Sequence, residues 1–262
     1  MIDLRRQPDR VLRIGHRGAP ALAPENTLDS FRAAVAVGVD LIEFDVLDLP
    51  RGPLIVAHSD HLAEVSHGAA RGRVRDLSLE ALRAVAPDVP TLAEALEFFV
   101  AEAPGVGLHV DLKLRSRHDE LAAAIVHHGL ETRTVVSGAR VADLKEVARR
   151  AQRVAVGITY PEDRLSISRK PYLWPVVSLG LTSMRASVPL RLPRLARRAG
   201  AHAVMLQHRL VTKASVALLH AAGLPVLTWT VDERADLERV VAAGVDGVIT
   251  NDPRIFPATL MS

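Results

Sequence analysis

The stretch AVAVGVDLIEFD (residues 34–45) joins a helical pattern to an apolar strand through the turn Gly38-Val39-Asp40. Glycine accepts the left-handed backbone conformation that ends a helix, so this turn marks a helix-to-strand step. A second stretch, VVAAGVDGVITND (240–252), has the same Gly-Val-Asp turn and a polar residue seven positions after its glycine. The two stretches together indicate an internal repeat of a strand and helix unit.

Nine segments of the chain have the apolar character of strands, and eight of them alternate with helical patterns. This alternation is typical of a parallel sheet, either closed into a barrel or open and doubly wound. We favour the closed form, an α/β fold of the (β/α)₈ or TIM-barrel type, which a chain of 262 residues can complete. The eight strands are expected at residues 11–16, 41–46, 107–113, 134–137, 154–158, 203–207, 225–231 and 247–250.

The ninth segment, residues 54–58, follows the second strand after a short link that contains Pro50, Gly52 and Pro53. Parallel neighbours need a crossover of about a dozen residues or more, so this segment is expected to form a hairpin arm at the barrel rim. Residues 59–106 contain two helix-like pieces and several prolines. We interpret them as a small helical insertion after the second strand, within a single domain that spans residues 1–262.

Composition argues against several classes of protein. The chain contains no cysteine, so any metal must be held by oxygen or imidazole. The net charge is only +3, and the arginines are spread along helical segments without accompanying aromatic residues, which argues against nucleic-acid binding. No apolar run reaches the roughly 18 residues of a membrane span, and charged residues interrupt the N-terminus where a signal peptide would begin. We expect a cytoplasmic protein without a transmembrane segment.

Acidic side chains stand where two of the expected strands end, which is where parallel barrels place their catalytic groups. Glu43 and Asp45 are two residues apart and share one face of their strand, and Asp111 and Lys113 repeat this arrangement. Carboxylates that meet in one lumen oppose joint ionisation unless a cation lies among them. Oxygen ligands favour Mg²⁺, Ca²⁺ or Mn²⁺ over zinc. The alternative is that these residues form buried ion pairs or are solvated at the strand ends.

Three other segment ends carry His16, His58 and Trp229. Imidazole titrates near neutral pH, so a histidine at such a position can act as a general base or a general acid. His16 and His58 are therefore the candidates for proton transfer. Arg17 has the planar fork that suits phosphate oxygens, and the alternative is that it forms a loop salt bridge.

Other polar residues have simpler explanations. Asn26 or Thr27 precedes an amphipathic helix and is expected to be its N-cap, while Glu25 could brace the adjacent histidine loop. Four histidines on helical stretches are expected to face solvent: His118, His127, His128 and His220.

With these residues identified, the chain resembles the glycerophosphodiester phosphodiesterase family. The segment HRGAPALAPENTLDSFRAAVAVGVDLIEFDV (16–46) is similar to the family's opening HRG, PENT and E-x-D signature. The match continues in order with LIVAHSDHL (54–62), VPTLAEAL (89–96) and DLKL (111–114), and with the closing strands LPVLTWTVDE and GVDGVITNDP (224–253).

The resemblance implies hydrolysis of a glycerophosphodiester to sn-glycerol 3-phosphate and an alcohol, assisted by a divalent cation such as Mg²⁺ or Ca²⁺, or by Mn²⁺. In the family the glycerol hydroxyl is thought to attack through a cyclic phosphate. The resemblance assigns the metal to Glu43, Asp45 and Asp111, and the acid and base roles to His16 and His58. We expect three residues to contact the substrate: Arg17, Lys113 and Trp229.

Three positions depart from the family pattern. Asp111 stands where the family usually has glutamate, so its carboxylate is one methylene shorter. Ser59 follows His58 where aspartate is usual, which removes a possible partner that would orient the imidazole. Asn251 replaces the usual aspartate of the last strand and is expected to touch the site only indirectly.

Two alternatives to this function are considered. A lysophospholipase D-like enzyme would place an acyl chain against an apolar patch that includes Leu173, Trp174 and Val176. A barrel that binds phosphodiesters without turnover is the other alternative, against which the presence of both His16 and His58 argues. The sequence specifies neither the leaving alcohol, nor the preferred metal, nor the oligomeric state.

Overall fold

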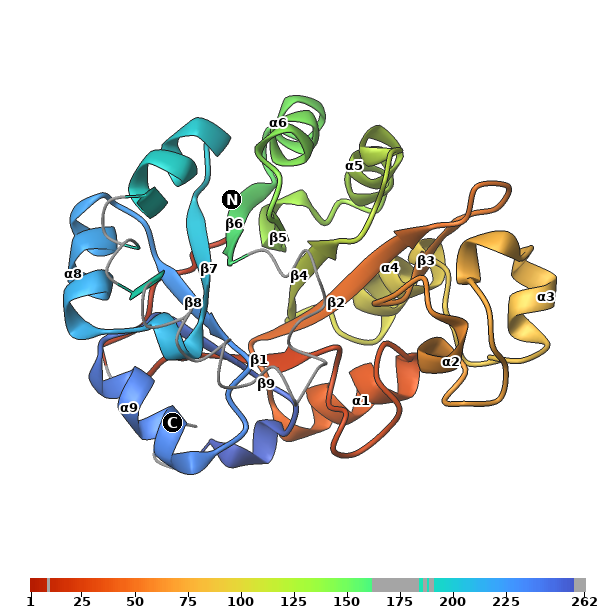
Figure 1. Cartoon of the computed structure of the whole chain (residues 1–262), viewed down its shortest axis with the longest axis horizontal. Helices are drawn as coiled ribbons and strands as arrows, with labels where there is room; N and C mark the ends of the chain where they lie inside the picture. The colour runs from red at the N-terminus through yellow and green to blue at the C-terminus, as the bar shows by residue number, and fades with distance from the viewer. Residues whose placement is uncertain (9, 162–183, 186–187, 189–190, 257–262) are drawn as a thin grey trace.

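The computed structural model describes residues 1–8, 10–161, 184–185, 188 and 191–256, in which eight parallel strands close into a barrel (Figure 1). Around the ring the order is β1-β9-β8-β7-β6-β5-β4-β2, and pairing of β1 with β2 closes it. The predicted (β/α)₈ barrel is confirmed. Its strands are β1 (Leu12–His16), β2 (Leu41–Asp48), β4 (Gly107–Leu112), β5 (Thr134–Gly138), β6 (Ala155–Tyr160), β7 (Ala203–Gln207), β8 (Val226–Trp229) and β9 (Gly247–Thr250).

Helices follow the strands and surround the barrel (Figure 1). Thr27 accepts a hydrogen bond from Ser30 N and so caps the first of them, and Gly38 ends it with a φ of 89°. This left-handed conformation returns the chain to β2, as the Gly-Val-Asp turn predicts. The helices are α1 (Leu28–Val37), α4 (Leu92–Ala101), α5 (His118–His127), α6 (Val141–Arg150), α8 (Lys213–Ala221) and α9 (Arg234–Ala242), with a further helix at residues 191–199 and 3₁₀ turns η2 (Glu131–Arg133), η5 (His208–Leu210) and η6 (Pro253–Ile255).

A small elaboration leaves the barrel after β2. Strand β3 (Leu54–Val56) turns back antiparallel along β2, as expected of a hairpin arm, and leads into α2 (Leu62–Val65), η1 (Val74–Asp76) and α3 (Leu79–Arg83). These pieces lie beyond α1 and α4 in Figure 1. They share an apolar cluster that includes Leu47, Ile55, Leu62 and Leu82. Helix α4 packs against α5 and occupies the place of the helix between β2 and β4, so the elaboration itself ends before α4.

Two apolar layers hold the barrel together. Inside it, Ile14, Leu41, Met205 and Ile249 belong to one buried cluster, which Leu4 of the N-terminal segment joins. Outside it, the outward side chains of the strands pack against the helices, where rings such as Phe31 and Phe44 lie 5.5 Å apart between centroids. Burial of these faces by the hydrophobic effect fixes which residues point into the lumen.

Some expectations outside the barrel need revision or lie beyond the described residues. His118 was expected to face solvent, but it is buried, and its Nε2 lies 3.6 Å from Asp143 Oδ2. The apolar patch at Leu173, Trp174 and Val176 falls outside the described residues. None of the helices in the described part of the chain combines the length and apolar character that a bilayer span requires.

Candidate active site

Three carboxylates meet at the carboxyl ends of neighbouring strands. Asp45 of β2 pairs in register with Asp111 of β4, and Glu43 lies one pleat deeper on β2. One oxygen from each of the three lies within 4.8 Å of the others. The hydrophobic pattern of β2 explains this convergence, because Ile42, Phe44 and Val46 face the helices and turn the alternate acidic residues inward.

Burial and mutual repulsion set the charge state of these groups. Glu43 is 4 % exposed, and burial, followed by the charges of Asp45 and Asp111, raises its pKa well above the usual value. Burial would also raise the pKa of Asp45, but Lys113, His58 and Arg17 outweigh it and lower this pKa. The protein's own cations therefore stabilise the ionised form of Asp45, whereas Glu43 lacks enough nearby positive charge to offset its burial. An all-oxygen donor set with excess negative charge fits a divalent cation.

Arg17 lies over the acidic group in an unusual backbone conformation. Its φ is 53°, in the left-handed region, and its backbone N–H donates to Glu43 Oε2 at 3.0 Å. Its guanidinium reaches Asp45 Oδ2 at 3.1 Å and Glu25 Oε1 at 2.7 Å. Such conformations in residues with a Cβ are held by the surrounding structure and cluster at functional sites. Glu25 braces this loop, as expected, through Arg17.

Lys113 follows β4 and points to the same acidic group. Its Nζ lies 2.5 Å from Asp111 Oδ2 and 3.3 Å from Asp45 Oδ1. Burial would lower the pKa of Lys113, but these two carboxylates outweigh it and raise this pKa, so the side chain stays charged. The two cations predicted from the sequence to contact substrate thus line the site and also hold its carboxylates.

His16 ends β1 opposite Glu43, with its Nε2 3.9 Å from Glu43 Oε2. Its Nδ1 lies 2.6 Å from Asn251 Oδ1. Burial, and then the charge of Arg17, lowers the pKa of His16 to about 4. Asn251 does not line the cavity itself, and it reaches the site through this hydrogen bond to the candidate catalytic imidazole.

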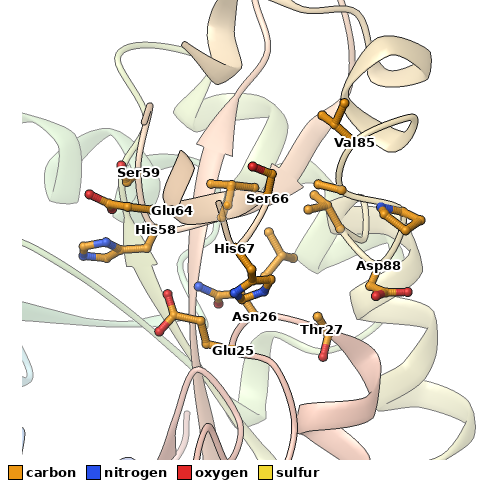
Figure 2. Close-up of a pocket in the computed structure, with 16 residues that line it drawn as sticks. Glu25, Asn26, Thr27, His58, Ser59, Glu64, Ser66, His67, Val85 and Asp88 are labelled. Atoms are coloured by element: carbon orange, nitrogen blue, oxygen red, sulfur yellow. The ribbon is translucent and has the colours of Figure 1, made fainter. Parts of the chain in front are cut away.

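His58 reaches the site from the end of the β3 arm. It lines the same cavity as His16, Glu43 and Asp45. Figure 2 shows its ring with the carboxylates of Glu64 and Glu25 above and below it in the view. The neighbouring Ser59 is buried, and its Oγ accepts a hydrogen bond from His61 N at 2.8 Å. The serine thus organises the turn into α2.

The site opens into a cavity of about 990 Å³ at the barrel mouth. Trp229 lines it from the end of β8, with its Nε1 donating to Met205 O at 3.2 Å. A second cavity of about 100 Å³ lies between the elaboration and the start of α1, and His58 and Glu64 belong to both (Figure 2). All eight residues selected from the sequence for the metal, proton-transfer and substrate roles therefore line one cavity.

Three residues of the site were missed by the sequence reasoning. Asn26 is not the N-cap of α1, which is Thr27; its Nδ2 donates to Asp45 Oδ2 at 3.0 Å, and its φ is 58°. Ser137 of β5 donates to Asp111 Oδ1 at 2.6 Å, and His109 Nε2 lies 2.8 Å from Ser137 Oγ. His109 could have been found from the sequence, because it lies two residues before Asp111 and so shares its face.

Comparisons with known proteins agree with this geometry. The model of the glycerophosphoryl diester phosphodiesterase family matches residues 16–255. A glycerophosphodiester phosphodiesterase from Caldanaerobacter subterraneus is 26 % identical, over 93 % of this chain and 95 % of its own. A Silicibacter pomeroyi crystal structure, a candidate member of that enzyme class, is 28 % identical with a TM-score of 0.79, over 98 % of this chain and 95 % of its own. An Oleispira antarctica phosphodiesterase with bound sn-glycerol 3-phosphate has the same fold at 20 % identity and a TM-score of 0.74, over 96 % and 98 %.

Proposed function

This chain belongs to the glycerophosphoryl diester phosphodiesterase family, and we propose that it hydrolyses glycerophosphodiesters to sn-glycerol 3-phosphate and an alcohol with the help of a divalent cation. The observation that carries the proposal is the meeting of Glu43, Asp45 and Asp111 within 4.8 Å, in a cavity that His16 and His58 also line. Two imidazoles beside an acidic, oxygen-only donor set can supply the acid, the base and the bound cation that assist phosphodiester cleavage.

Glu43, Asp45 and Asp111 would hold the cation. When bound, it would polarise the phosphoryl oxygens and offset charge that develops on them. The oxygen donors fit Mg²⁺, Ca²⁺ or Mn²⁺, and we propose one of these as the resident ion. Arg17 and Lys113 line the same cavity, so their charges would help to draw the anionic phosphate to the carboxylates that they already contact.

Proton transfer is the work of the two histidines. The attacking oxygen must lose a proton, and the leaving alkoxide must gain one, so a base and an acid are both required. His16 approaches from β1 and His58 from the β3 arm, on separate elements that border one cavity. One imidazole cannot perform both tasks at once, which explains why the site has two.

Release of choline from glycerophosphocholine, with and without a chelator, tests this proposal. We expect release that EDTA abolishes and that added Mg²⁺, Mn²⁺ or Ca²⁺ restores. Lysophosphatidylcholine in a parallel assay tests the lysophospholipase D-like activity, and binding of glycerophosphocholine without turnover would identify a non-catalytic barrel. Full activity after exhaustive chelation would contradict the metal dependence.

A further inference from the structure

A chain of hydrogen bonds runs from the surface to His16 through Asn251. Asp232 follows β8, and its Oδ1 accepts from Asn251 N at 2.8 Å and from Thr250 Oγ1 at 3.2 Å. Its Oδ2 accepts from Asn251 Nδ2 at 2.7 Å. The loop that carries Asp232 is itself held in place, because Val231 N donates to Ile249 O at 2.9 Å. Asp232 therefore grips both the backbone and the side-chain amide of Asn251.

The donors and acceptors along this chain permit only one arrangement. An ionised carboxylate only accepts, so Asp232 must face the NH₂ group of Asn251. This turns Asn251 Oδ1 toward His16 Nδ1, at 2.6 Å. An amide oxygen only accepts as well, so the proton of the neutral imidazole must sit on Nδ1. The lone pair then belongs to Nε2, which faces the cavity on the side of Glu43.

We propose that Asn251, oriented by Asp232, is a positioning residue that holds His16 in the Nδ1-protonated tautomer and so makes its Nε2 the proton-accepting atom of the site. The inference rests on the proposed function, in which His16 and His58 divide the acid and base roles. It assigns the base role to His16 and leaves protonation of the leaving alcohol to His58. The family resemblance predicts a carboxylate at position 251. In this chain the carboxylate is that of Asp232, and the side-chain amide of Asn251 lies between it and the imidazole of His16.

Imidazole ¹⁵N chemical shifts test the tautomer without any need for turnover. In uniformly ¹⁵N-labelled protein, with Mg²⁺ or with EDTA, we expect a protonated Nδ1 and an unprotonated Nε2 for His16. The signals of His16 are identified by their absence from the spectrum of His16→Gln. A His16 protonated on Nε2 in the native chain would overturn the proposal, whether or not the protein hydrolyses glycerophosphocholine.

Three variants test the two partners. Asn251→Ala and Asp232→Ala should each give a mixture of His16 tautomers and lower kcat by about 10-fold or more, with KM changed by less than about 3-fold, as expected for loss of an orienting partner. The exchange Asp232→Asn with Asn251→Asp keeps an acceptor against Nδ1 and should restore both the single tautomer and kcat. Asp252→Ala is the matched control, because the side chain of this neighbouring aspartate bonds to Arg254.

The outcomes separate positioning from general damage. Unchanged tautomer and kcat in both single variants would overturn the proposal. Should Asn251→Ala fail to fold, the exchanged pair decides, because loss of the single tautomer in that folded variant would also overturn it. If native protein shows the expected tautomer but no turnover on any glycerophosphodiester, the proposed function fails while the positioning of His16 stands.

Discussion

Ser137 Oγ lies 2.6 Å from Asp111 Oδ1 and donates a hydrogen bond to it. The hydroxyl proton is used in this bond, so the oxygen is left to accept from His109 Nε2 at 2.8 Å. Asp111 has a shorter side chain than the glutamate usual in the family. Contacts from Ser137 and Lys113 hold it toward the other two carboxylates.

Ser137→Ala should weaken metal binding by roughly 10-fold, because partners that orient a ligand typically contribute 10- to 100-fold to affinity. Isothermal titration calorimetry with Mn²⁺ measures the change in affinity. Thr159→Val is the matched control, since its hydroxyl lies at the longer distance of 3.5 Å from the same Asp111 oxygen and should matter less. Equal affinities for native protein and Ser137→Ala would show that Asp111 needs no such support.

Glu43→Gln should stabilise the metal-free protein while abolishing its response to metal. The pKa of Glu43 is raised by burial and by Asp45 and Asp111, so its charged form destabilises the fold at any pH above the unfolded pKa. A neutral isostere removes this cost, so the free energy of unfolding in EDTA should be higher for Glu43→Gln than for native protein. Thermal unfolding in EDTA and in excess Mg²⁺ measures both effects. A variant that is less stable in EDTA than native protein would refute the explanation.

His16→Ala and His58→Ala should each lower kcat by roughly 10²- to 10⁴-fold, the usual scale for loss of general acid–base catalysis. Substrate affinity should change much less, because the proposed phosphate contacts are Arg17 and Lys113 rather than the histidines. His61→Ala is a suitable control, because this exposed histidine lines the same cavity and has no proton-transfer role here. If His58→Ala retained native kcat, the leaving alcohol would have to receive its proton from another group.

The sequence was sufficient to predict the barrel fold because the same pattern of strand and helix recurs along the chain. All eight strands are apolar runs, and β2, β7, β8 and β9 each follow a glycine turn, so an error in one segment does not change the whole. The convergence of Glu43, Asp45 and Asp111 follows from the same regularity, because alternation along a strand sends every second residue inward. The catalytic and ligand roles of these residues stay predictions.

What the sequence could not supply were contacts between side chains on different loops. Asn26 or Thr27 was interpreted as the cap of the first helix, and Thr27 has that role. Asn26 instead has a left-handed backbone, and its side chain donates a hydrogen bond to Asp45. The bond from Asn251 to His16 joins residues 235 positions apart, and no local pattern encodes it. The prediction that His118 faces solvent was wrong for the same reason, since its side chain lies against Asp143 of α6, which its own helix does not reveal.

Ser59→Asp should raise kcat rather than lower it. Asp at this position can accept the hydrogen bond that Ser59 Oγ now takes from His61 N, so the turn into α2 should survive. It would also place a carboxylate beside His58, where the family usually has one. Steady-state kinetics with glycerophosphocholine measure the change, and Ser59→Asn is the neutral control. A loss of activity specific to the aspartate would indicate that the surroundings of His58 have been rebuilt around the serine.

Arg75→Met should destabilise the fold in a pH-dependent way, because Arg75 and Asp48 form a buried ion pair that joins the elaboration to β2. Their closest atoms are 2.6 Å apart, and both side chains are 7 % exposed. Burial would raise the pKa of Asp48, but its hydrogen bonds from Arg75 and from Arg115 N outweigh it and lower this pKa. The pair therefore stabilises the fold fully above the unfolded pKa of about 4, and progressively less as pH falls through the folded pKa.

At pH 7 the Arg75→Met variant should lose about 3 kcal/mol of unfolding free energy, because it leaves the buried carboxylate of Asp48 without its cation, and this deficit should shrink below pH 4. Urea denaturation across this pH range measures it. Arg73→Met is the matched control, since this neighbouring arginine is half exposed and its pair with Asp60 should contribute little. A deficit that stays constant from pH 7 to the acid limit would show that Arg75 acts through packing rather than through the charge of Asp48.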